Sequence, residues 1–166
     1  MSKRITLKSC VEFAVATESE LGEYYDYLSR QCSEDQELAD LFKTLSKDEE
    51  VHKVQFEKLL EKVSDKDEGL PAEENDFLLA MSLSKTFTDL YGRKEFVYER
   101  DHREKLLFEL FEFEKATLGF YTALMENMND DDILRQIVDI EKRHVVAVMK
   151  MVVTETKFTS LGDDWP

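Results

Sequence analysis

Apolar residues recur along the first third of the chain with the spacing of two amphipathic helices. In both segments they fall at alternating steps of three and four, which places them on one face of a helix. The pattern predicts helices over Leu7–Gln31 and Asp35–Ser64, and Ser33 with Gln36 gives a capping-box signal between them. The expected inward positions are Val11, Ala14, Glu18, Leu21, Tyr25, Leu28 and Cys32 in the first helix, and Leu38, Phe42, Leu45, Glu49, His52, Phe56, Leu59 and Val63 in the second.

The last third of the chain shows the same periodicity in two further segments. A third helix is predicted over His102–Met128, with Asp101 as its cap. Asn129 and the three aspartates after it suit a turn, and a fourth helix is expected from there to about Thr156, with the remaining tail unassigned. The expected inward positions are Leu107, Phe111, Glu114, Leu118, Tyr121, Met125 and Met128, followed by Leu134, Ile137, Glu141, His144, Val148 and Met151.

An irregular stretch separates the two pairs of helices. Residues 65–101 contain Gly69 and Pro71 and predict a long crossover, in which Phe77–Leu83 fits a short helix. Two short turns and one long connection are typical of two helical hairpins packed together. The expected fold is therefore all-α, an antiparallel four-helix bundle of two hairpins with a long crossover between helices two and three.

The composition agrees with such a bundle and argues against some classes of binding partner. The chain has 166 residues, of which 42% are apolar, with only two prolines and five glycines, so we expect one domain over residues 1–166. The formal net charge of -15 argues against nucleic acid and membrane surfaces as partners. No apolar run approaches the roughly 18 residues that span a bilayer.

The N-terminus and the cysteines indicate the compartment. Lys8 and Glu12 interrupt what would be the apolar region of a signal peptide, so we expect a cytoplasmic protein. Cys10 and Cys32 form no Cys-x-x-Cys pair, which excludes a four-cysteine metal site and a disulfide framework. We interpret both as reduced thiols buried in a helix.

Six polar side chains interrupt the apolar seams. An isolated ionised carboxylate in a core costs many kcal/mol unless it is paired or binds a metal, and several carboxylates in one layer repel one another. Two divalent cations would neutralise them, and Glu with His three residues later can ligate from one helical face. The alternative is that Arg or Lys partners neutralise these groups, or that they face solvent. The candidate metal ligands are Glu18, Glu49, His52, Glu114, Glu141 and His144.

Helical register supports one shared layer. Residues equally far from the turn of an antiparallel hairpin lie at the same height. Glu18 and Glu49 have their midpoint at position 33.5, in the first turn, and the midpoint of Glu114 and Glu141, 127.5, lies close to the second. The two hairpins also share their spacing, since each carries a Glu, a Tyr seven residues later and then Glu-x-x-His, as a duplicated helix pair would.

The remaining candidates are weighed by the same register. Glu99 and His102 also form Glu-x-x-His, but His102 precedes Glu114 by twelve residues, so we interpret the pair as surface groups at a helix start. Tyr25 and Tyr121 lie on the seams near the predicted layer. They are either packing residues with a hydrogen bond or groups that hold the metal ligands in place.

This ligand pattern resembles that of ferritin-like di-iron and di-manganese carboxylate proteins, in which two helices supply one Glu each and two supply Glu-x-x-His. Within that superfamily the chain is most similar to rubrerythrin-like proteins, with bacterioferritin as the competitor. The resemblance implies that Glu49 and Glu141 bridge two iron ions, with manganese or zinc as alternatives. It also implies one set of terminal ligands for each ion, Glu18 with His52 and Glu114 with His144.

Four departures from these families limit the resemblance. Rubrerythrins typically add a rubredoxin-like domain with iron held by four cysteines, and this chain has two cysteines in all. They also carry a further Glu one turn before the ligand on helix three, where this sequence has Phe111. Val51 cannot supply the thioether with which bacterioferritins ligate haem, and the stretch from His52 to Glu114 is longer than either family leads us to expect.

The implied function is a di-iron oxidoreductase that oxidises Fe(II) or reduces peroxide or dioxygen, with an external electron donor. One alternative is a non-enzymatic iron-binding or storage protein of bacterioferritin type. Another is a structural bundle that takes up zinc adventitiously. We also expect the chain to form a homodimer.

Overall fold

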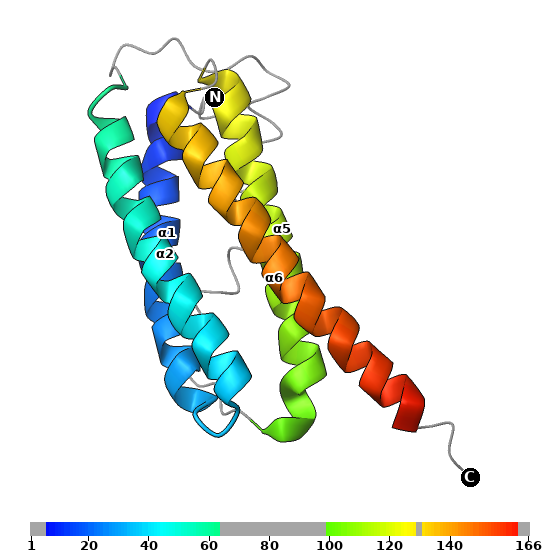
Figure 1. The fold of residues 1–166 in the computed structure, drawn as a ribbon. Helices are drawn as coiled ribbons and strands as arrows, with labels where there is room; N and C mark the ends of the chain where they lie inside the picture. Colours follow the sequence, from blue (N-terminus) through cyan, green and yellow to red (C-terminus); the bar gives the residue numbers. More distant parts are fainter. Residues whose placement is uncertain (1–5, 64–98, 129–130, 163–166) are drawn as a thin grey trace, which may run out of the picture.

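The computed structural model describes residues 6–63, 99–128 and 131–162, and within this part the chain is helical with no strand. Helix α1 spans Leu7–Gln31 and α2 spans Gln36–Leu60. A short 3-10 helix η1, Arg100–His102, leads into α5, Arg103–Asn127, and α6 spans Asp132–Gly162. Figure 1 shows the four long helices side by side, so the predicted all-α four-helix bundle is confirmed.

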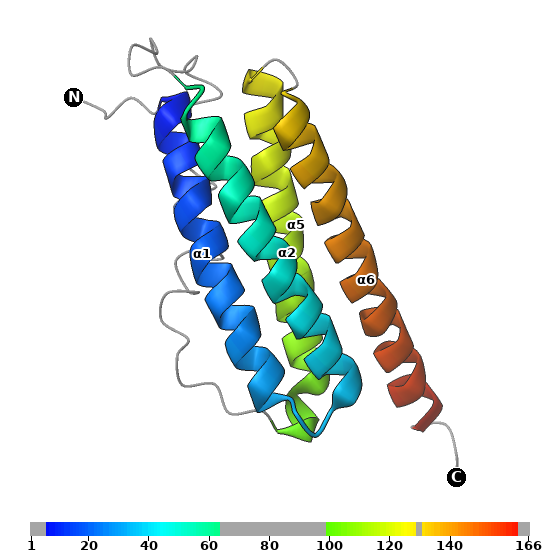
Figure 2. The ribbon, with the colours of Figure 1, turned by 60° about the vertical axis from the view of Figure 1, so that its left-hand side comes forward.

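The helices pair as two hairpins whose neighbours run antiparallel. Helix α1 packs on α2 and α5 on α6, and the hairpins meet through α2 with α6 and α1 with α5 (Figures 1 and 2). The Lys62 ammonium lies 3.2 Å from the Asp131 carboxylate, which ties the end of α2 to the start of α6. Arg103 pairs with Asp35, which ties the start of α5 to the α1–α2 turn. The end of α2 and the start of α5 thus lie at opposite ends of the bundle.

Local hydrogen bonds explain where the first hairpin begins and turns. Thr6 and Ser9 form a reciprocal capping box, so α1 begins at the predicted Leu7. The N-cap of α2 is Asp35, whose carboxylate accepts a hydrogen bond from the Leu38 N–H at 3.2 Å. The prediction of Ser33 as part of a capping box was therefore wrong, since Ser33 lies inside the turn.

Two other predicted boundaries also differ. Helix α2 ends at Leu60 rather than at Ser64, because the N–H groups of Lys62 and Val63 bond to carbonyls only three residues back and tighten the chain into a turn. Asp101 is not the cap of α5, since it lies within η1 and the N-cap is His102, which makes no capping bond with its side chain. Most of the predicted crossover, including Phe77–Leu83, lies outside the described residues.

The fourth helix is longer than its pattern predicted. It continues to Gly162, past the expected end near Thr156, so part of the unassigned tail is helical. Cys32, expected inside a helix, is the buried C-cap residue of α1, while Cys10 is buried within it. None of the helices in the described ranges is long and apolar enough to cross a membrane.

The core lies where three of the four seams predicted it. The seams of α1, α2 and α6 are buried apart from Val63 and Met151, which are half-buried. In α5 the inward face is turned by about one residue, so that the predicted positions Phe111, Leu118, Met125 and Met128 are only half-buried. Apolar residues occupy two adjacent faces of α5, and the pattern alone could not choose between them. The buried residues of α5 are Leu106, Leu107, Leu110, Phe113, Glu114, Thr117, Phe120, Tyr121 and Leu124.

Candidate metal centre

All six predicted ligands lie together in the middle of the bundle, and none is more than 4% exposed. Two overlapping groups place their potential ligand atoms within 4.8 Å of one another. His102 does not join them, since it is partly exposed and its ring lies 3.8 Å from Glu99, as expected for a surface pair. The first group is Glu18, Glu49, His52 and Glu141, and the second is Glu49, Glu114 and His144.

The Nδ1 atom of His52 faces three carboxylates. It lies 2.8 Å from Glu49 Oε2, 3.0 Å from Glu141 Oε1 and 3.6 Å from Glu18 Oε2. These oxygens come from three different helices, so the ring closes a compact set of donors across the core.

The Nδ1 atom of His144 faces a matching set. It lies 3.6 Å from Glu49 Oε1, 3.8 Å from Glu141 Oε2 and 3.5 Å from Glu114 Oε2. The two imidazole rings have their centroids 5.7 Å apart. Each ring thus faces one of two overlapping sets of donor atoms.

The two sets share two carboxylates. Glu49 presents Oε2 to His52 and Oε1 to His144, and Glu141 presents Oε1 to His52 and Oε2 to His144. Glu18 approaches only the His52 ring and Glu114 only the His144 ring. This division into two shared and two unshared carboxylates is what two metal ions with two bridging ligands require.

Buried polar atoms that lack a hydrogen-bond partner indicate whether these residues fit a metal ion. Within the described residues, Glu18 Oε2, both carboxylate oxygens of Glu141 and Nδ1 of His144 are buried without a hydrogen-bond partner. Buried acceptors are normally satisfied, and these are the atoms that face the shared space. Carboxylate and imidazole donors suit iron, manganese and zinc. The residues therefore fit a pair of such ions.

The two tyrosines join the site by crossing between the hairpins. Tyr25 of α1 donates a hydrogen bond to Glu114 Oε1 of α5 at 2.5 Å, and Tyr121 of α5 donates to Glu18 Oε1 of α1. Each hairpin thus holds the unshared carboxylate of the other. Burial, together with the negative charges of Glu114 and Glu49, raises the pKa of Tyr25 well above its ordinary value. Tyr25 therefore remains a protonated donor.

The crowded carboxylates resist ionisation in the metal-free protein. Burial, followed by repulsion from Glu18 and Glu141, raises the pKa of Glu49 well above its ordinary value. Burial raises the pKa of Glu141 to about 7, against the opposing effect of its close contact with the His52 ring. The folded protein thus retains protons at this site that an unfolded chain would release.

The histidines carry the compensating charge. Burial lowers the pKa of His52, but close polar contacts with Glu141, Glu18 and Glu49 outweigh it and raise the pKa to about 12. The pKa of His144 rises to about 9, because its close contact with Glu114 and the charge of that carboxylate outweigh burial. Metal ions require neutral imidazoles, so metal binding must release protons.

One polar contact at the site was not predicted from the sequence. His144 Nε2 lies 3.1 Å from the Oδ2 atom of Asp48, on α2. Asp48 directly precedes Glu49, whereas Ile140 occupies the same place before Glu141. That difference between the two motifs is the only signal the sequence offers, and it becomes meaningful once α2 and α6 are known to be neighbours.

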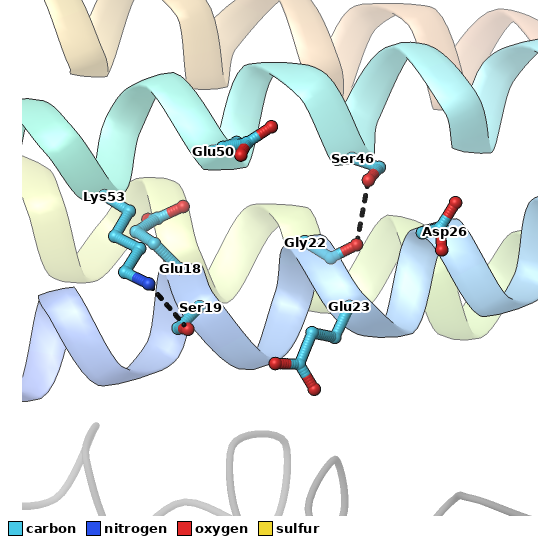
Figure 3. A pocket seen from close by; sticks show the side chains of 8 residues that line it. All are labelled: Glu18, Ser19, Gly22, Glu23, Asp26, Ser46, Glu50 and Lys53. Atoms are coloured by element: carbon cyan, nitrogen blue, oxygen red, sulfur yellow. Dashed lines mark hydrogen bonds between the residues drawn. The ribbon is translucent and has the colours of Figure 1, made fainter.

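A surface cavity of about 280 Å³ lies beside the site, between α1 and α2 (Figure 3). Ser46 Oγ donates to the Gly22 carbonyl at 2.9 Å, and Lys53 Nζ donates to Ser19 Oγ at 3.2 Å, both across the two helices. Solvent reaches the helix face that carries Glu18, although Glu18 itself has no exposed surface. The cavity is lined by Glu18, Ser19, Gly22, Glu23, Asp26, Ser46, Glu50 and Lys53.

The fold and the site together define a class. An antiparallel four-helix bundle with a buried cluster of one Glu from each of two helices and Glu-x-x-His from each of the other two is that of the ferritin-like carboxylate proteins. A sequence model of the rubrerythrin family matches residues 10–152, and the chain belongs to that family. No curated protein and no solved structure matched the chain.

Proposed function

We propose that this chain is a di-iron oxidoreductase of rubrerythrin type, which oxidises Fe(II) or reduces peroxide or dioxygen. The observation that carries the proposal is the placement of Glu49 and Glu141, each with one oxygen toward His52 and the other toward His144. A site for a single ion would not require two carboxylates that each face both imidazole rings. The family match supports the same reading.

The six candidate ligands would hold the two ions in two sets. Glu18 and His52 would hold one ion, Glu114 and His144 the other, and Glu49 and Glu141 would bridge them. Bound iron supplies the electron transfer to peroxide or dioxygen. The protein supplies charge neutralisation and an apolar surround.

Aromatic side chains provide that apolar surround. The Phe42 ring stacks on Tyr25 with their centroids 6.0 Å apart, and the Phe56 ring packs on Tyr121 at 4.7 Å. These contacts keep bulk water away and fix the hydroxyl groups that orient Glu18 and Glu114.

An external electron donor is part of the proposal. The two cysteines of these 166 residues are too few for a four-cysteine iron site. Phe111 also stands where rubrerythrins carry a further Glu, and it is half-buried and packs on the core. The proposed activity therefore rests on six protein ligands.

Anaerobic titration with Fe(II), followed by peroxide with an excess of reductant, tests the proposal. We expect two ions per chain and repeated reduction of peroxide. Glu49→Gln should lose the paired site, whereas Glu50→Gln, the same change on the exposed neighbour, should keep it. Saturation at one ion per chain would contradict the paired site. Two ions oxidised once, without turnover and in a large assembly by gel filtration, would favour storage.

The histidines provide a second matched comparison. His52→Ala and His144→Ala should each weaken one ion, because each ring faces one set of donors. His102→Ala also removes an imidazole three residues after a Glu, but from the surface, and should leave two ions bound. Equal losses at all three positions would show that the cluster is not the metal site.

A further inference from the structure

The two halves of the site match in their carboxylates and differ in how their histidines are held. His144 Nε2 lies 3.1 Å from Asp48 Oδ2. The corresponding Nε2 atom of His52 is buried without a hydrogen-bond partner among the described residues. Asp48 precedes Glu49, and the matching place before Glu141 is filled by Ile140, whose side chain cannot accept a hydrogen bond.

We propose that Asp48 is a positioning residue for one metal ion only, the ion held by Glu114 and His144, and that it makes the two metal positions inequivalent. The inference rests on the paired metal site of the proposed function. When Nε2–H donates to a carboxylate, the lone pair is fixed on Nδ1, the atom that faces the cluster, and the ring becomes a more basic ligand.

The contact crosses the interface between the hairpins. Asp48 belongs to α2 and His144 to α6, so the hydrogen bond also sets the rotation of the ring relative to Glu49. The Asp48 side chain is 41% exposed while that of His144 is 5% exposed, so Asp48 links a buried ring to solvent. His52 has no exposed surface. Among the described residues, the polar groups around its ring are the carboxylates that face Nδ1.

Anaerobic titration with Co(II), followed by visible absorption, measures the two positions separately. Removing an outer carboxylate from a metal-ligating histidine typically lowers affinity by about 10–100-fold, and we expect Asp48→Ala to weaken one of the two binding steps by that order. Asp48→Asn keeps an acceptor and loses the charge, so its effect should be smaller. Asp40→Asn, about two turns earlier on the exposed face of α2, is the control for charge alone and should leave both steps unchanged.

Double variants decide which ion Asp48 serves. In the His52→Ala background, one ion remains beside His144, and Asp48→Ala should weaken it. In the His144→Ala background the remaining ion lies beside His52, and Asp48→Ala should have no effect on it. Equal effects in both backgrounds, or none in either, would overturn the proposal. Circular dichroism of each metal-free variant checks that the helices are retained.

A second readout does not depend on affinity. In Zn(II)-loaded protein, ¹⁵N spectra of the histidine rings should show a change at Nε2 of His144 on going from wild type to Asp48→Ala, with His52 unchanged. Changes at both rings or at neither would also overturn the proposal. Neither readout requires turnover, so a wild-type protein that binds two Co(II) ions but does not reduce peroxide would contradict the proposed activity and leave this inference standing.

Discussion

Raising the pH should destabilise the metal-free protein, because its folded state holds protons that the unfolded chain has released. The Glu141 carboxyl has an ordinary pKa of 4.5 and a folded pKa of about 7. Its stabilising contribution is fully present below pH 4.5 and is lost as the pH rises to about 7. The imidazole of His144 loses its stabilising contribution in the next pH range, since its pKa rises from an ordinary 6.5 to about 9. Both shifts have the same sign, and the raised pKa of Glu49 adds to them.

The size of the effect follows from proton linkage. For each proton that the folded state holds and the unfolded chain does not, the free energy of unfolding falls by about 1.4 kcal/mol per unit rise in pH. Between pH 5 and 8 the overlapping windows of Glu141 and His144 together give a loss of roughly 4–5 kcal/mol, and His52, whose pKa is raised in the same direction, adds to it. The two groups interact, so they titrate as a coupled system and the loss belongs to the cluster. A domain of ordinary stability, about 5–15 kcal/mol, would show this plainly.

Urea unfolding of metal-free protein, followed by circular dichroism at pH 5, 6, 7 and 8, measures the loss. Glu141→Gln removes the titrating carboxyl and should flatten the curve below pH 7 while leaving the His144 window. Glu50→Gln, an exposed site on α2, should leave the wild-type slope. Metal should reverse the trend, since binding improves as ligands lose protons and adds about 4 kcal/mol at a thousandfold excess over Kd. A metal-free protein equally stable at pH 5 and 8 would refute the reasoning.

Two further predictions concern how the helices are joined. A Cβ at Gly22 would lie 3.6 Å from the Ser46 carbonyl oxygen and 3.8 Å from Glu49 Cβ, which is ordinary contact, so Gly22→Ala should stabilise α1 by roughly 0.5–1 kcal/mol in urea unfolding and retain two metals. A destabilised variant would show that the helices cannot accept a methyl group there. Arg103 contacts carboxylates of both hairpins and is only 15% exposed, so Arg103→Gln should cost about 2–3 kcal/mol, whereas Lys105→Gln, on an exposed pair, should be almost neutral. Equal effects of the two substitutions would contradict the role of Arg103 as a link between the hairpins.

The layer of candidate metal ligands was predictable because helical register is a property of the sequence. The first turn, between Gln31 and Gln36, is centred at position 33.5, the midpoint of Glu18 and Glu49. The second turn, between the end of α5 and the start of α6, is centred two residues beyond the midpoint of the other pair. Heights along an antiparallel pair follow from such counts, without knowledge of any side-chain contact.

Rotation about the helix axis was less predictable than height. In α5, Phe113 and Glu114 are both buried, as are Phe120 and Tyr121, so two neighbouring faces compete for the interior. The predicted seam contained Glu114 and Tyr121 but also Leu118, which is only half-buried. The choice is made by what α1 and α6 present to α5, and a single helix does not encode it.

Contacts between the hairpins could not be read from either hairpin alone. Tyr25 and Tyr121 were expected near the layer, but their exchange of partners depends on α1 and α5 facing each other. Asp48 reaches His144 for the same reason, across α2 and α6. Periodicity assigns residues to a face, and the identity of the helix opposite that face is a property of the assembled bundle.

Because these contacts cross between the hairpins, both hairpins are needed to form the site. Tyr121 holds Glu18, Tyr25 holds Glu114, and Glu49 faces a histidine from each hairpin. Neither hairpin alone contains a bridging pair, so metal affinity and docking of the hairpins are linked, and each strengthens the other by the same free energy. In the proposed paired site, two divalent cations would bind where buried carboxylates otherwise repel one another. The residues that weaken the metal-free bundle at high pH are therefore the ones through which bound metal would join its halves.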